Sequence, residues 1–169
     1  MSNVAFKYTG LFILLALAQV LVFNNIDFAG YIDPYIYVIF ILLYPINSNQ
    51  TLFIFVSFLL GLTVDMFLNS GGINAAACLF IAYIRPIVLK LSFGTSYEYH
   101  AIKIESTFFS ERFKYFLIMI GIHHFTLFAF EIFNIAQILS ILKKTLFSGI
   151  FTLLLSLLLV SLFSRKKES

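Results

Sequence analysis

Six apolar stretches, separated by short polar segments, occupy nearly all of this 169-residue chain. Most of them approach the roughly 20 apolar residues that an α-helix needs to cross the hydrocarbon core of a bilayer. Too few residues remain for a separate soluble domain. The pattern therefore predicts one domain, residues 1–169, folded as an all-α integral membrane bundle. We expect six transmembrane helices, at residues 6–23, 33–46, 51–68, 73–91, 113–133 and 145–163.

The composition indicates that lipid is the solvent for most side chains. Hydrophobic residues make up 61% of the chain and charged residues 11%, and the mean hydropathy is +0.99. A water-soluble domain needs a more polar surface than this. The formal charge of +3 does not indicate nucleic acid, because the basic residues stand at helix ends, where anionic lipid attracts them. Cys78 is the single cysteine, which excludes a disulfide framework and a cysteine metal site. We also expect no other metal site and no cofactor.

The first apolar stretch permits two interpretations. Lys7 before it and the small residues at 16–18 resemble a signal peptide and its cleavage site. The apolar run nevertheless continues to Phe23 without the polar break that normally follows cleavage. We therefore favour a first transmembrane helix that is retained.

The second stretch is short for a membrane span and has proline near both ends. Asp33 is a suitable N-cap, and Pro34 is tolerated at a first helical position, where its missing N–H needs no partner. Pro45 then ends the run. A short helix of this kind is typical of backbone that lines a cavity, or of a tilted helix, and both interpretations stay open.

The distribution of lysine and arginine predicts the orientation. With six spans, nine of these residues fall on the side of the N-terminus and two on the other. Because cytoplasmic loops are enriched in lysine and arginine, we predict cytoplasmic N- and C-termini and a cytoplasmic loop at residues 92–112. The first set is Lys7, Arg85, Lys90, Lys103, Arg112, Lys114, Arg165, Lys166 and Lys167; the second is Lys143 and Lys144.

A carboxylate lies inside the third apolar stretch. Asp65 shares one helix face with Ser57 and Gly61, at intervals of four residues. A charge at the bilayer centre costs roughly 2.5–3.5 kcal/mol on insertion scales. Asp65 is therefore either a buried anchor that hydrogen-bonds a neighbouring helix or the turn at residues 69–74, or an interfacial carboxylate that reaches water.

Polar residues in the later stretches predict contacts between helices. Arg85 follows a stripe of small residues and precedes a proline, so we expect its guanidinium to extend to the cytoplasmic surface, too far from Asp65 for an ion pair. His124 and Glu131 share a face that we assign to the bundle interior, because a third metal ligand is lacking. His123 points elsewhere and is interpreted as a tolerated aromatic. Small and polar residues also form a stripe in the last stretch, at Thr145, Gly149, Thr152 and Ser156. None of these sets is a catalytic constellation, so we expect no enzyme.

The order of several short motifs resembles a known family. Residues 31–37 (YIDPYIY) lead into a span that ends at residues 43–45 (LYP). Residues 61–67 (GLTVDMF) follow, then residues 71–77 (GGINAAA) and residues 82–86 (AYIRP). This order is similar to that of MreD, the small multispan rod shape-determining membrane protein of bacteria.

The resemblance implies a non-enzymatic scaffold in the bacterial inner membrane. It would bind MreC and act with MreB, RodA and a class B penicillin-binding protein in cell shape and lateral peptidoglycan synthesis; whether it forms a homodimer stays open. Its helices would be arranged like the vitamin-binding S-components of transporters, by fold-level analogy. Asn74 stands where many members carry histidine. The candidate structural or partner-contact residues are Asp33, Pro34, Gly61, Asp65, Gly72, Asn74, Ala76, Arg85, His124 and Glu131.

An alternative function is that of an S-component-like subunit that binds a small molecule such as a vitamin. This function requires a cavity near the outer face with convergent polar groups. The residues that can supply them are Asp33, Asp65, Asn74 and Glu131.

Overall fold

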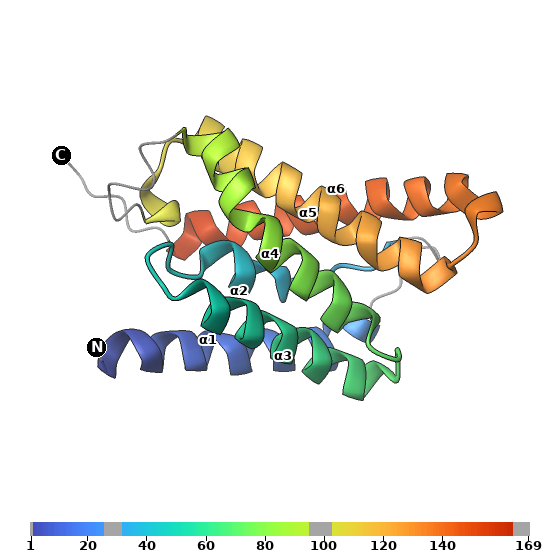
Figure 1. The fold of residues 1–169 in the computed structure, drawn as a ribbon, viewed down its shortest axis with the longest axis horizontal. Coiled ribbons are helices and arrows are strands. Elements are labelled where there is room, and N and C mark those ends of the chain that lie inside the picture. Colours follow the sequence, from blue (N-terminus) through green and yellow to red (C-terminus); the bar gives the residue numbers. More distant parts are fainter. Residues whose placement is uncertain (1, 26–31, 95–102, 164–169) are drawn as a thin grey trace.

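The computed structural model describes residues 2–25, 32–94 and 103–163, and this part of the chain is helical (Figure 1). Five of its helices, counted with the short turns beside two of them, are long and apolar enough to cross a membrane. The prediction of an all-helical bundle with several helices suited to cross a membrane is confirmed at this level. The long helices are α1 (Ser2–Leu21), α3 (Gln50–Leu68), α4 (Ile73–Phe93), α5 (Phe109–Ile132) and α6 (Ile138–Phe163).

The long helices lie side by side, and consecutive ones pack against each other from α3 to α6. Helix α4 lies between α3 and α5, while α1 packs against α3 (Figure 1). Helix α1 begins and α6 ends at the same end of the bundle (Figure 1). Short 3-10 turns follow α1 (η1, Phe23–Asn25) and precede α5 and α6 (η3, Ile104–Ser106; η4, Ile135–Gln137).

The second expected span differs from the prediction. Helix α2 is Val38–Leu43, only six residues, which is about 9 Å of helix and too short to cross a hydrocarbon core of about 30 Å. It begins after Tyr37, so Asp33 and Pro34 do not start it. Residues 36–42 are at most 3% exposed. The segment 32–46 is therefore a short helix with non-helical flanks, enclosed by the long helices.

The hairpin of α3 and α4 is held by close backbone contact. A Cβ atom on Gly61 would lie 2.5 Å from the Asn74 carbonyl oxygen and 2.6 Å from the Cα atom of Ala75. Only glycine allows the two helices to approach this closely. The turn between them uses left-handed backbone at Asn69 (φ 54°) and at Gly72 (φ 95°), a conformation that glycine and asparagine adopt most readily.

Pro86 stands inside α4 without breaking the helix. Its missing N–H leaves the Ala82 carbonyl, four residues earlier, without its helical partner. The Gln50 Nε2 atom of α3 donates to that oxygen at 3.1 Å. A side chain of the neighbouring helix thus replaces the lost backbone bond, as lipid cannot.

Two predicted boundaries move by several residues. Helix α5 begins at Phe109, inside the loop predicted at residues 92–112, and α6 begins at Ile138, before the predicted start at residue 145. Lys144 is accommodated within α6 because its Nζ atom lies 3.0 Å from Glu131 Oε1 at the end of α5. Residues 95–102 of the predicted loop and the basic C-terminal residues 165–167 lie outside the described residues.

Candidate functional site

Polar side chains of the long helices surround the segment 32–46 and bond its backbone. At the start of the segment, Asp33 N donates to Ser148 Oγ at 3.0 Å and Tyr35 N donates to Thr152 Oγ1 at 3.1 Å. Both acceptors belong to α6 and are fully buried. An unbonded N–H at this depth would cost several kcal/mol, on the order of the full desolvation penalty. Of the polar stripe predicted on the last helix, only Thr152 holds this non-helical backbone; Ser148, which was not in the predicted stripe, is the second acceptor, and the buried hydroxyls of Thr145 and Ser156 have no partner in the described structure.

Gln19 of α1 bonds the same stretch from the opposite side. Its Oε1 atom accepts from Ile36 N at 2.8 Å, and its Nε2 atom donates to the Pro34 carbonyl at 3.0 Å and to Asn24 Oδ1 at 2.9 Å. Gln19 is 1% exposed. The sequence interpretation missed this residue, although a glutamine inside a long apolar run was a signal.

His124 extends the contacts of α6 to α5. Its Nδ1 atom lies 2.9 Å from the Ile120 carbonyl, and its Nε2 atom lies 3.1 Å from Thr152 Oγ1. Because a carbonyl only accepts, the neutral ring carries its proton on Nδ1. The Thr152 hydroxyl then donates to Nε2 and accepts from the Tyr35 N–H. The assignment of His124 to the bundle interior is confirmed, whereas Glu131 lies at the periphery in its pair with Lys144.

Asp65 is buried and caps α4 from the end of α3. Its Oδ1 atom accepts from the backbone N and the Nδ2 of Asn74, both at 3.0 Å, and from the Ser70 hydroxyl. Its Oδ2 atom accepts from Ala75 N at 2.7 Å. A carboxylate is stabilised here by the unpaired N–H groups and the positive end of the helix dipole. Asp65 is 4% exposed, so the anchor interpretation is confirmed and the water-reaching one is wrong.

A chain of hydrogen bonds leads from Asp65 to the segment 32–46. Asn74 Oδ1 accepts from the Tyr37 hydroxyl at 2.8 Å, and that hydroxyl lies 3.0 Å from His123 Nε2. His123 is fully buried. The interpretation of His123 as a tolerated aromatic on another face is therefore wrong, since its ring helps to fix Tyr37 just before α2.

Arg85 bonds the other end of the segment 32–46. Its Nη2 atom donates to the carbonyls of Leu42, at 3.2 Å, and of Tyr44. Its Nε atom donates to the Tyr115 hydroxyl at 2.8 Å, and its guanidinium carbon lies 4.7 Å from the Phe53 ring centroid. Arg85 is 3% exposed, so the expectation that it extends to the surface is wrong. The cation instead occupies the C-terminal end of α2, where helix carbonyls lack partners.

The sequence predicted that Arg85 and Asp65 lie too far apart for an ion pair, and they do not pair in the structure. Asp65 bonds the turn and the start of α4, whereas Arg85 bonds the C-terminal end of the segment 32–46. Within the described ranges no carboxylate lies within 4.0 Å of the guanidinium. The Tyr8 hydroxyl of α1 completes this end by donating to the Leu43 carbonyl at 3.2 Å. The segment is therefore fastened by side chains at both ends, and its middle is enclosed by apolar ones.

Other candidate residues line two cavities. A cavity of about 350 Å³ is lined in part by Asp33, Pro34, Asn74 and Glu131. Three of the four residues considered for a small-molecule site thus converge, while Asp65 lies behind Asn74 and bonds it.

A larger apolar groove of about 800 Å³ runs between α3, α4 and α5. Its lining includes the candidates Gly72 and Ala76, together with Gly121 and large side chains such as Phe58 and Phe125. A Cβ atom on Gly121 would meet no heavy atom within 4 Å in the described part of the chain.

The buried polar side chains of this site make structural hydrogen bonds. The buried polar side chains named above bond backbone or one another, and no group of three His, Cys, Asp or Glu side chains among residues 2–25, 32–94 and 103–163 is placed to hold a metal. Comparison of the chain with protein families, with curated proteins and with solved structures found no match. Function is therefore inferred from the geometry of the site and from the order of the sequence motifs.

Proposed function

We propose that this protein is a non-enzymatic, MreD-like membrane scaffold of the bacterial elongation machinery. In this role it binds MreC and, with MreB, RodA and a class B penicillin-binding protein, supports cell shape and lateral peptidoglycan synthesis. The observation that carries the proposal is that residues of the MreD-like motifs have structural roles. Gly61, Asp65, Asn74 and Arg85 all hold helices or backbone in place. Residues that build a rigid frame suit a protein whose task is to position partners.

The apolar groove between α3, α4 and α5 is the proposed site for the membrane-spanning segment of MreC. In lipid, helices associate through close packing, which small residues permit. Ala76 and Gly121 provide such a surface between larger side chains. A glycine inside a helix costs about 1 kcal/mol relative to alanine, and the described chain gives Gly121 no packing reason for it. A partner helix that packs closely against α5 would explain why residue 121 is glycine.

Substitutions that fill the groove test this proposal. Gly121→Leu and Ala76→Leu should abolish co-purification with MreC in mild detergent and should fail to restore rod shape in depleted cells. Gly10→Leu is the matched control, because Gly10 is also a helical glycine whose Cβ would meet nothing within 4 Å in the described structure, and it lies on α1 outside the groove. Retention of MreC by both groove variants would refute the site. Normal shape after depletion in a rod-forming host, with no MreC association, would refute the function.

The proposed location is the inner membrane, with both termini in the cytoplasm. This is supported by the two ends of the bundle: α1 begins and α6 ends together (Figure 1), and Lys143 and Lys144 stand near the start of α6 at the opposite end. A reporter fused to Ser169 should be active only in its cytoplasmic form. Activity of the exported form would reverse the orientation.

A second candidate function is that of a small-molecule-binding subunit of the S-component kind. The observation that favours it is the cavity of about 350 Å³ where Gln19, Asp33, Asn74 and Glu131 meet. Its test is thermal unfolding of the purified protein with a panel of water-soluble vitamins. A stabilisation that Glu131→Gln removes and Gly121→Leu retains would favour this function over the scaffold.

A further inference from the structure

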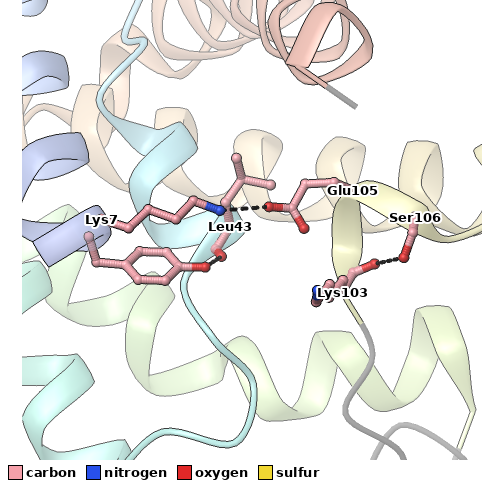
Figure 2. A network of polar contacts seen from close by, with 6 residues as sticks. Lys7, Leu43, Lys103, Glu105 and Ser106 are labelled. Atoms are coloured by element: carbon pink, nitrogen blue, oxygen red, sulfur yellow. Dashed lines mark hydrogen bonds and ion pairs between the residues drawn. The ribbon is translucent and has the colours of Figure 1, made fainter. Parts of the chain in front are cut away.

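A third cavity lies at the end of the bundle where α1 begins, and its lining combines positive charge with apolar surface. It has a volume of about 400 Å³ and is bounded by the start of α1, the residues after α2 and the turn η3. Its lining residues include the cationic Lys7 and Lys103, the acidic Glu105 and the aromatic Tyr8 and Tyr44. Figure 2 shows Lys7 extending from α1 toward Glu105; Lys103 lines the same cavity.

The ion pair inside the cavity is loose. Lys7 Nζ lies 3.9 Å from Glu105 Oε1, and the Lys7 side chain is 66% exposed. A pair at this distance and exposure holds its partners weakly. The Lys7 ammonium therefore stays accessible to a second anion, and the Lys103 side chain is exposed as well.

A buried cation reinforces the positive potential. Tyr44 lines the cavity, and its carbonyl accepts from Arg85. Among the described residues, Arg85 has no carboxylate partner within 4.0 Å. Its charge is therefore balanced only by dipoles, and buried charges are screened little by solvent. In the described part of the chain, Lys7 and Lys103 thus line the cavity with Glu105 as the carboxylate, and Arg85 lies behind Tyr44.

The position of the cavity fits the depth of lipid headgroups. Lys7 is at the beginning of the first apolar helix, whose membrane-compatible part starts at Phe6. The rings of Tyr8 and Tyr44 lie 5.3 Å apart beside it, and tyrosine is enriched where hydrocarbon meets headgroups. Leu43 and Ile104 add apolar walls. A ligand with a phosphate and an acyl chain would match both parts of this lining.

We propose that this cavity binds the phosphate group of an anionic phospholipid in the leaflet at this end of the bundle. Lys7 and Lys103 donate to the phosphate oxygens, Arg85 adds to the field from behind Tyr44, and Glu105 competes with the phosphate for Lys7. The proposal does not depend on the scaffold function. It predicts opposite effects for the lysines and for the glutamate.

Native mass spectrometry of the full chain, released from nanodiscs of mixed phosphatidylglycerol and phosphatidylcholine, tests the proposal. The wild type should retain phosphatidylglycerol preferentially. Lys7→Gln/Lys103→Gln should reduce that retention by roughly fivefold per lysine, as one charge near an anionic surface implies. Lys90→Gln/Lys143→Gln is the matched control, because it removes the same charge from two exposed lysines outside the cavity, and it should change retention less than twofold, as order-of-magnitude surface effects allow. Glu105→Gln should increase retention.

Three results would overturn the assignment. Equal losses of phosphatidylglycerol retention in the two double variants would show that retention depends on general surface charge and not on the cavity. A loss on Glu105→Gln would contradict the competition for Lys7. Equal retention of phosphatidylglycerol and phosphatidylcholine by the wild type would show that the cavity does not select an anionic headgroup. Because the substituted side chains are exposed or partly exposed, all variants should unfold at the wild-type temperature, which serves as the folding control.

Discussion

Replacing Asp65 by asparagine separates two physical views of a carboxylate inside a membrane protein. If desolvation dominated, removal of the charge would stabilise the protein, since the insertion cost of roughly 2.5–3.5 kcal/mol would disappear. The structure predicts the opposite. Both carboxylate oxygens accept hydrogen bonds, including two from backbone N–H groups at the start of α4. Asparagine has one acceptor oxygen and places an NH₂ group against at least one of these donors.

The magnitude follows from the bonds that are lost. Hydrogen bonds to a charged group contribute about 1.5–3 kcal/mol each, and a buried donor left unbonded costs about 1–3 kcal/mol. We therefore expect Asp65→Asn to lower the free energy of unfolding by about 3–5 kcal/mol, including the lost attraction to the helix dipole. Reversible unfolding in mixed micelles, followed by circular dichroism, measures this change.

A second carboxylate provides the control. Glu131→Gln removes an equal charge from a side chain that is 40% exposed and paired with Lys144, where the effect should stay within about 1 kcal/mol. If Asp65→Asn were neutral or stabilising while Glu131→Gln behaved as expected, the capping role of Asp65 would be refuted.

Three further substitutions test the fastening of the segment 32–46 and the α3–α4 contact by the same unfolding measurement. Arg85→Lys should cost about 2–3 kcal/mol, because a single ammonium cannot reproduce the directed bonds of the guanidinium fork; a wild-type value would contradict this role. Gly61→Ala should cost about 1–3 kcal/mol or more, because the new methyl group meets backbone that cannot yield, and unchanged stability would show that the helices separate freely. Thr152→Val should cost about 1–3 kcal/mol by leaving the Tyr35 N–H unbonded. Ser156→Ala on the same helix should be neutral, because its buried hydroxyl has no partner in the described structure; equal effects of these last two would argue against a specific bond.

The long helices were predictable because their signal is local. An apolar run of sufficient length determines a membrane helix by itself, and α3 and α4 begin and end within about two residues of the prediction, the uncertainty of any boundary assignment. Tight turns with asparagine and glycine mark their ends. The role of Asp65 was also within reach, since the turn that it bonds is only a few residues away.

The interrupted second span was not predictable from its own residues. Its flanks are non-helical because side chains far along the chain take their hydrogen bonds: Ser148 and Thr152 stand 115 and 117 residues after the groups they accept from. No local pattern encodes such a pairing. Arg85 was misplaced for a similar reason, because its acceptors lie about 40 residues earlier. A polar residue in an apolar run indicates that a partner exists, and only the fold identifies that partner.

The long-range bonds of the segment 32–46 impose an order on biogenesis. When this stretch leaves the ribosome, the serine and threonine that will accept from Asp33 and Tyr35 have not yet been translated. Free in lipid, its flanks would expose unbonded peptide groups, which hydrocarbon does not tolerate. The nascent chain must therefore keep this stretch beside the insertion machinery, or in contact with Gln19, until the last helix arrives and completes the bundle.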